Sequence, residues 1–169
     1  MAQKMITGYT PSTDSPHIYA EDDAQIYRAI FGQSGITEAD NKLECTLIDN
    51  NTVQLASGAF VHQGYFVVVP GGFVEQLSVE SGSQNVYRKD LVVAHFIRGG
   101  GATADQHYFE VVTGTPASSL SAAADPDLIQ GNLASGGSEN QEALYRVIIS
   151  GLSITGIERV APYVGSYYQ

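Results

Sequence analysis

One predicted β-hairpin, over residues 87–116, constrains the fold of this chain more than any other segment. Its first arm, residues 90–97, is an almost unbroken apolar run, which is typical of a strand buried on both faces. Three consecutive glycines occupy the connection at 98–106, where a flexible loop is expected. The second arm, residues 107–113, alternates between two sets of side chains, as a strand does. A hairpin of this length predicts a β-rich fold.

Further strands are expected on both sides of this hairpin. Alternating runs bounded by Gly, Pro, Asn and Asp predict antiparallel pairing through short turns. The expected strands are 43–48, 52–55, a second hairpin at 57–69 with its tip at 62–64, 73–79, 144–150 and 154–160. We therefore predict a mainly β fold, an antiparallel β-sandwich-like domain with one N-terminal α-helix and extended terminal segments. Within the central hairpin we expect Leu91, Val93 and Phe96 in the main core.

The one clear helical pattern covers residues 18–32. Ile26 and Ile30 are four positions apart and share a stripe of the helix. Acidic residues at 21–23 suit the positive end of the helix dipole, and Gly32 suits a left-handed C-terminal cap. We expect Ile26 and Ile30 to be buried against the β-domain or a neighbouring subunit.

The length of 169 residues suits one domain, which we place at 18–161. Residues 1–17 are expected to form an N-terminal arm, and residues 162–169 a C-terminal tail. The segment 117–140 is long for a loop without periodicity, and we expect it to wrap the surface or contact another subunit. The tail carries tyrosines, a residue type enriched at interfaces. The candidate interface residues are Tyr163, Tyr167 and Tyr168.

The charge balance excludes several classes of partner. Eight basic against 18 acidic residues give a formal net charge of −10. Nucleic acids and anionic membranes attract basic faces, so neither is an expected partner. Since the chain shows no signal-peptide pattern and no run of about 18 apolar residues, we expect cytoplasmic synthesis without membrane insertion. The single Cys45 excludes an internal disulfide and is expected to be a small buried side chain.

No pattern of catalytic, cofactor-binding or metal-binding residues stands out, so we expect no enzyme activity, no cofactor and no metal site. The glycine-rich loop at 99–104 leads into a strand, whereas a dinucleotide site needs a helix there. His95 and His107 could meet across the central hairpin, where packing or a hydrogen bond is more common than metal binding. Arg88 and Asp90 are expected to form a salt bridge or anchor a turn.

Several motifs occur in an order that resembles structural proteins of tailed bacteriophages. The helical motif AEDDAQIYRAIFGQSGI comes first, and GAFVHQGYFV resembles an early hairpin of these proteins. YRKDLVVAHF and FEVVTGTPA resemble a strand after Arg-x-Asp and a strand ending in Gly-Thr-Pro. ALYRVIISGLSITGIERV resembles their closing pair of strands, so the likeness covers about residues 20–160. The chain departs from the pattern at Ala20, where a capping Ser or Thr is favoured, and at Glu158–Arg159.

This resemblance implies a non-enzymatic virion protein of a phage or prophage tail or baseplate, made in the bacterial host cytoplasm. Such a protein assembles as a homo-oligomer, with a trimer as the expected symmetry. It contacts other tail or baseplate proteins and links or presents host-recognition components. An alternative function is a carbohydrate-binding module for host-surface glycans, with Tyr65 and Tyr108 as candidate contacts. A third and weaker hypothesis is a small hydrolase of cell-wall glycans, which would need a pair of carboxylates in a cleft.

Overall fold

The computed structural model describes residues 19–165 and has the mainly β, antiparallel, sandwich-like architecture predicted from the sequence. The described residues form one α-helix followed by strands in three sheets. The elements in chain order are α1 (Ala20–Phe31), β1 (Gly35–Thr37), β2 (Cys45–Asp49), β3 (Thr52–Leu55), β4 (Gly58–His62), β5 (Tyr65–Val69), β6 (Glu75–Ser78), β7 (Tyr87–Ile97), β8 (Gln106–Val112), the 3-10 turn η1 (Leu133–Ser135), β9 (Glu139–Ser150), β10 (Ser153–Arg159) and β11 (Tyr163–Val164). The expected arm at 1–17 lies outside the described residues.

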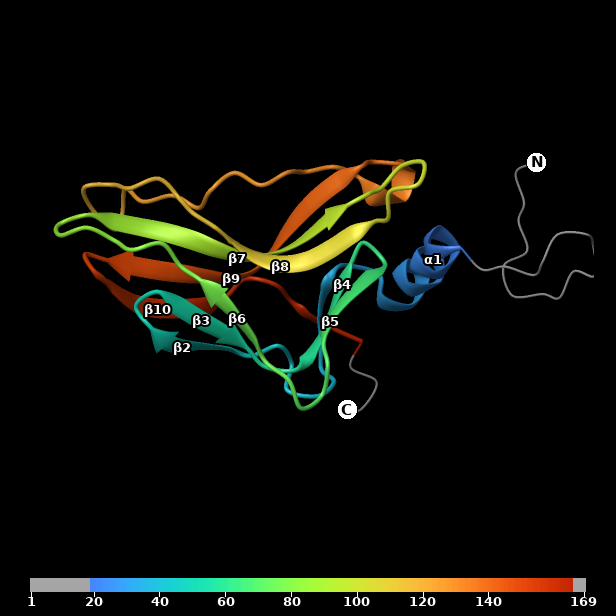
Figure 1. Cartoon of the computed structure of the whole chain (residues 1–169), viewed down its shortest axis with the longest axis horizontal. Coiled ribbons are helices and arrows are strands. Elements are labelled where there is room, and N and C mark those ends of the chain that lie inside the picture. The colour runs from blue at the N-terminus through green and yellow to red at the C-terminus, as the bar shows by residue number, and fades with distance from the viewer. Residues whose placement is uncertain (1–18, 166–169) are drawn as a thin grey trace, which may run out of the picture.

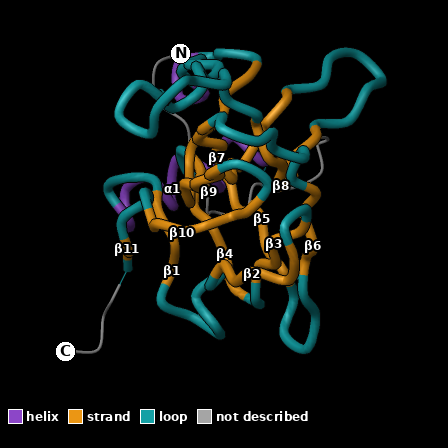
Figure 2. Tube along the Cα trace, turned by 90° about the vertical axis from the view of Figure 1, so that its left-hand side faces the viewer, coloured by secondary structure: helices purple, strands orange, loops and turns teal. Residues whose placement is uncertain are grey.

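The large sheet has the strand order β10-β9-β7-β8, and the two smaller sheets have the orders β11-β1-β4-β5 and β2-β3-β6. Strands β7, β8 and β9 lie above β2, β3 and β6 in both Figure 1 and Figure 2. Neighbouring strands are antiparallel except for the parallel pair β1 and β11. Strand β10 also contacts β2, and β6 contacts β8, so the large sheet and β2-β3-β6 form a half-barrel. The helix α1 lies at one end of the long axis, beside β5 (Figure 1).

The predicted hairpins are confirmed. Strands β7 and β8 pair from Leu91 opposite Val112 to Ile97 opposite Gln106, as the central hairpin requires. Strands β4 and β5 pair through a two-residue turn in which Gln63 and Gly64 have φ of 49° and 89°. Two successive positive φ values fit the right-handed twist of the flanking strands, which explains the tight turn.

The main core lies between the sheets and includes Cys45, confirming it as a small buried side chain. Val92 and Ala94 of β7 point into this core. Leu91 and Val93 are also buried, but successive side chains of a strand point to opposite faces, so they lie on the outer face of the sheet. The segment between β8 and β9 crosses that face (Figure 1). The expectation that Leu91 and Val93 belong to the main core is therefore wrong, because a loop covers them instead.

Phe96 belongs to a second, smaller cluster with Ala24, Tyr65 and Leu133, so its expected place in the main core is also corrected. This cluster joins α1 to the end of the large sheet. The helix approaches closely because the β4–β5 turn has no side chain at Gly64: an added Cβ would lie 2.1 Å from the Ala24 carbonyl oxygen. Small residues on both partners thus allow the contact.

The helix itself ends as predicted, with Gly32 in the left-handed conformation and its N–H bonded to the Arg28 oxygen at 2.9 Å. Its orientation differs from the expected one. Ile26 is half-buried and Ile30 is 52% exposed, because the Ala24 side of the helix faces the turn. Burial of Ile30 against the β-domain is therefore wrong, while burial against a neighbouring subunit stays a prediction.

Two boundaries also differ from expectation. Strand β9 begins at Glu139, five residues before the predicted start, and uses the end of the expected 117–140 loop. Isolated β-bridges hold this loop against the sheet: Ala117 pairs with Tyr87 of β7, and Gln130 pairs with Asn140 of β9. Two residues of the expected tail, Tyr163 and Val164, form β11. No helix among residues 19–165 has the length and apolar character needed to cross a membrane.

Candidate functional site

An apolar band lies on the outside of α1, β5 and the β5–β6 connection. Burial alternates along β5: Tyr65, Val67 and Val69 point inward, while Phe66 and Val68 point outward. Strands with one solvated face usually carry polar residues there, so outward Phe and Val need a further explanation. The residues of the apolar band are Tyr27, Ile30, Phe66, Val68, Phe73 and Val74.

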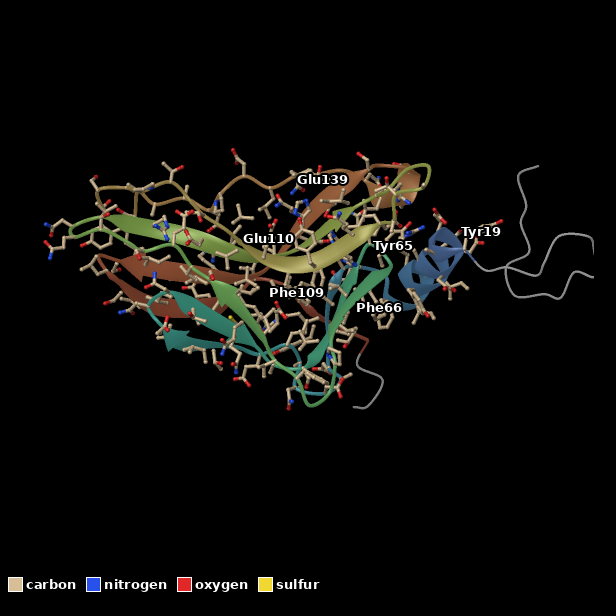
Figure 3. The ribbon with its side chains drawn as sticks, viewed as in Figure 1. Tyr19, Tyr65, Phe66, Phe109, Glu110 and Glu139 are labelled. Carbon is tan, nitrogen blue, oxygen red and sulfur yellow. The ribbon has the colours of Figure 1, made fainter. Side chains whose placement is uncertain are left out.

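Ring contacts join the helix to the strand within this band. The Tyr27 and Phe66 rings meet edge to face with centroids 4.8 Å apart, and Phe31 meets Phe66 at 5.7 Å. Figure 3 shows Phe66 beside α1. Phe73 is 67% exposed and Val68 is 53% exposed. The band is therefore an ordered surface with large apolar side chains in solvent.

A groove of about 380 Å³ continues the band between β5 and β8. Val68, Phe73 and Val74 line one side, and Tyr108 and Phe109 line the other. Both strands are at the edges of their sheets in the described structure, so each has one side without a strand partner. Strand edges carry unpaired backbone donors and acceptors and can pair with another chain.

A buried polar joint lies beneath this region and connects β4, β8 and β9. His62 is completely buried; its Nδ1 lies 3.0 Å from His107 Nε2, and its Nε2 lies 2.5 Å from Asn140 Oδ1. Asn140 in turn donates from Nδ2 to the Gly131 oxygen at 2.8 Å. With Oδ1 of Asn140 as acceptor, His62 carries its proton on Nε2 and accepts from His107 Nε2–H. Two neutral imidazoles satisfy the hydrogen bonds that run from His107 through His62 to Asn140.

Burial explains why neutral rings are favoured in the joint. It lowers the pKa of His62 to about 4 and the pKa of His107 to about 3. Each charged ring would also repel a neighbouring imidazolium, which lowers the pKa values further. The joint therefore favours uncharged histidines near neutral pH.

A third histidine, His95, lies on the outer face of the large sheet between two carboxylates. Its Nδ1 is 2.6 Å from Glu110 Oε1, and its Nε2 is 2.6 Å from Glu139 Oε1. The Tyr108 hydroxyl lies 3.2 Å from Nδ1, and Gln141 donates to Glu110 at 2.8 Å. Figure 3 shows Glu110 and Glu139 on the upper face of the sheet.

The two carboxylates of this outer cluster are the pair to test against the hydrolase hypothesis. Inverting glycosidases hold a water between two carboxyl groups, while retaining ones place a nucleophile beside the sugar. Here the His95 ring occupies the space between Glu110 and Glu139 and binds an oxygen of each. No group of three or more His, Cys, Asp and Glu side chains in residues 19–165 could hold a metal ion.

The expected contact between His95 and His107 is wrong. Strand pairing places His95 opposite Tyr108 and His107 opposite Phe96, so the two histidines point to opposite faces of the hairpin. A one-residue difference in register has this effect because side chains alternate along a strand. His107 pairs with His62 instead, a contact that the sequence analysis missed because nothing local relates β4 to β8.

The candidate tyrosines have different environments. Tyr65 is 8% exposed, contacts the Phe96 ring with centroids 4.5 Å apart and accepts a hydrogen bond from Arg98, so the expected exposure of Tyr65 is wrong. Tyr108 is 36% exposed and stays a candidate. Tyr163 is 38% exposed, and the Arg159 guanidinium lies 4.0 Å from its ring centroid. Tyr167 and Tyr168 lie outside the described residues.

The predicted ion pair between Arg88 and Asp90 is confirmed, with Nε 2.7 Å from Oδ1. Both side chains are buried, and Asp90 also accepts from the Gly114 backbone N–H. Arg88 donates further to the backbone oxygens of Glu80 and Ser81. These bonds fix the loops around the start of β7, which is a structural role.

Comparison of the chain with models of known protein families and with curated proteins finds no match. The surfaces described above and the resemblance in the sequence remain as indications of function.

Proposed function

We propose that this chain is a non-enzymatic structural protein of a phage or prophage tail or baseplate, which assembles as an oligomer. In this role it links or presents the components that recognise the host. The observation that carries the proposal is the apolar band. Exposed apolar patches rimmed by polar residues are typical of protein–protein contacts, and burying them in an assembly removes their cost in water.

The partner at the apolar band is a neighbouring copy of this chain, with a trimer as the expected assembly. The sequence resemblance to symmetric tail proteins supports this choice. In a cyclic trimer the contact is heterologous, so the band of one copy meets a different surface of the next. The free edges of β5 and β8 offer backbone groups to the same neighbour.

A charge introduced into the band tests the assembly. Val68→Glu places a carboxylate on an outward position of β5, which should leave the fold intact and reduce the oligomer to monomers of 18.0 kDa in light scattering. The matched control is Ile48→Glu, because Ile48 is 48% exposed on β2, outside the band. An oligomer that survives Val68→Glu with unchanged mass, or dissociates equally in both variants, would overturn the role of the band.

A carbohydrate-binding module is a second candidate function, favoured by the surroundings of Tyr108. Its half-exposed ring could stack on a sugar, while Glu110, Glu139 and Gln141 offer hydrogen-bonding groups beside it. A glycan array on the purified protein tests this function. Binding that is lost in Tyr108→Ala would support it, and an array without any bound glycan would oppose it.

A further inference from the structure

A pocket of about 390 Å³ surrounds Tyr163, where β2, β9, β10 and β11 meet the loop that precedes β2. We call it the Tyr163 pocket. Its walls are formed by Asn41, Lys42, Glu44, Tyr145, Arg159 and Tyr163. This volume is within the range of about 300–1,000 Å³ that is typical of small-molecule sites.

Two cations face this pocket without a carboxylate partner. The Lys42 ammonium lies 5.5 Å from the Tyr163 ring centroid, and the Arg159 guanidinium lies 4.0 Å from it. Neither forms an ion pair within residues 19–165, although the whole chain has a net charge of −10. Arg159 donates one hydrogen bond, to the Ala161 oxygen at 2.6 Å, which leaves further N–H groups free. The pocket is thus locally cationic in an acidic protein.

Tyr145 contributes a hydroxyl group to the lining of the same pocket. Tyr145 is 6% exposed, and its hydroxyl forms no hydrogen bond in the part of the chain that the structure describes. Burial raises the pKa of Tyr145 to about 12, and Arg159 acts in the opposite direction. The Tyr145 hydroxyl can therefore donate a hydrogen bond to a ligand in the pocket.

Uncharged and acidic groups complete the lining. Asn41 uses its amide nitrogen to bind Ser57 Oγ at 2.8 Å, and its amide oxygen remains available. Glu44 is exposed at the rim, and Ile157 adds an apolar surface. Together with the two cations, these groups match a ligand that has one anionic group, several hydroxyls and an apolar ring face.

We propose that the Tyr163 pocket binds an acidic sugar, a hydroxylated ring that carries one carboxylate or phosphate group. Lys42 and Arg159 bind the anionic group. Tyr145, Asn41 and Glu44 bind the ring hydroxyls. This site is separate from the Tyr108 surface and from the apolar band, and it does not depend on the oligomer proposed above.

Titration of the full-length protein with four probes tests the proposal, with backbone amide NMR shifts as the readout. Glucuronate carries a carboxylate, glucose 1-phosphate carries a phosphate, glucose carries no charge, and inorganic phosphate has no sugar ring. At least one acidic sugar should shift the amides around the pocket and bind at least about tenfold more tightly than glucose and inorganic phosphate, a difference of about 1.4 kcal/mol. Which of the two binds more tightly identifies the preferred anionic group.

Variants assign the binding to the pocket. Lys42→Asn removes a cation from an exposed position with φ 56°, a conformation that asparagine tolerates, so the fold should persist. Together with Arg159→Gln, it should weaken the acidic sugar about tenfold or more. Lys89→Gln removes the same charge on β7 and is the control, which should bind as the unaltered protein does.

Three results would overturn the proposal. The first is the absence of any shift of the pocket amides with each probe at about 20 mM, a concentration at which a site with a dissociation constant of about 1 mM would be almost fully occupied. The second is inorganic phosphate binding as tightly as the acidic sugars, which indicates a bare anion site. The third is unchanged binding in Lys42→Asn and Arg159→Gln.

Discussion

The apolar band and the Tyr163 pocket are two surfaces of one small chain with opposite chemistry. In the band, Phe66 and Val68 of β5 and Phe73 of the β5–β6 connection extend apolar side chains into solvent. In the pocket, two cations without an ion pair among residues 19–165, Lys42 and Arg159, lie beside one aromatic ring. The band is an open surface suited to another protein, whereas the pocket is a small hollow suited to a ligand.

The stability of the fold accounts for neither the apolar band nor the Tyr163 pocket. The main core does not include the exposed residues of the band. Elsewhere a loop covers an apolar sheet face, as it does over Leu91 and Val93. Likewise, the buried cation of Arg88 is neutralised by Asp90, whereas the cations of the pocket have no such carboxylate among the described residues. Variants in each surface should therefore change one function and leave the other unchanged.

The largest expected effect is that of pH on the buried histidines beneath the band. The joint beneath the band contains His62 and His107, whose pKa values fall from 6.5 to about 4 and about 3 in the folded chain. The unfolded chain binds these protons first, so stability is full above about pH 6.5 and is lost as the pH falls toward 4. At about 1.4 kcal/mol per pKa unit, the loss is on the order of several kcal/mol.

Urea unfolding at pH 7, 5.5 and 4.5 measures this loss. Glu142, 3.6 Å from His62, offsets part of the loss of stability. Burial raises the pKa of its carboxyl, so protonation at low pH relieves the cost of burying its charge. His95, which contacts Glu110 and Glu139, also lies near the two buried histidines. Hydrogen exchange should show that β4 and β5 open before β9 and β10. A free energy of unfolding that stays constant from pH 7 to 4.5 would contradict the neutral joint.

The next effect comes from Gly64→Ala, which should loosen α1 and the band but not the pocket. Gly64 has φ of 89°, and a Cβ there would lie 2.1 Å from the Ala24 oxygen. We expect a loss of at least about 1–2 kcal/mol from the left-handed conformation alone, plus the cost of moving the helix. The control is Gly72→Ala, with φ of 84° and no described atom within 4 Å of the added Cβ. Equal losses in the two variants, measured by urea unfolding, would mean that the helix contact contributes nothing.

A smaller effect on stability is expected for Ile30→Ala. Because Ile30 is 52% exposed, its truncation should change the free energy of unfolding by less than about 0.5 kcal/mol. The same variant should weaken the oligomer, since Ile30 belongs to the band. Urea unfolding of dilute and of concentrated protein separates the effect on the fold from the effect on the oligomer. Truncation of a core side chain usually costs about 2–5 kcal/mol, so a loss of that size in the dilute monomer would show that Ile30 is packed.

The smallest expected effect is that of salt. Each copy has a net charge of −10, so association brings like charges together. Raising the salt from about 0.05 to 0.5 M shortens the Debye length and should strengthen the oligomer modestly. The acidic sugar should respond in the opposite direction, because its attraction to Lys42 and Arg159 is screened. Weakening of both interactions by salt would indicate that charge pairs, rather than the apolar band, hold the oligomer together.

The sequence predicts the structure correctly where local chemistry determines it. The turn at Gln63–Gly64, the strand β3 and the cap at Gly32 all follow from residues within a few positions of one another. Predictions from the sequence are wrong where a contact between distant residues determines the structure. The helix orientation depends on Gly64, and the face to which His95 points depends on hairpin register.

The functional surfaces were harder to predict for the same reason. Tyr163 was selected as an interface residue from its type alone, and nothing local relates it to Lys42 or Tyr145, which join it only in the folded chain. Tyr65 was selected as an exposed ring, yet Phe96 and Arg98 enclose it. Phe66 and Val68 belong to a predicted strand whose side chains alternate between two faces. The alternation does not show which of these apolar faces points to solvent.

Sedimentation of the full-length protein over a concentration series tests the proposal of an assembling tail protein most directly. At roughly 10 to 200 micromolar, where contacts with micromolar dissociation constants are populated, the mass should approach three times the 18.0 kDa of one chain. Val68→Glu in the same experiment should shift the curve toward the monomer. A mass of 18.0 kDa at every concentration would contradict the account.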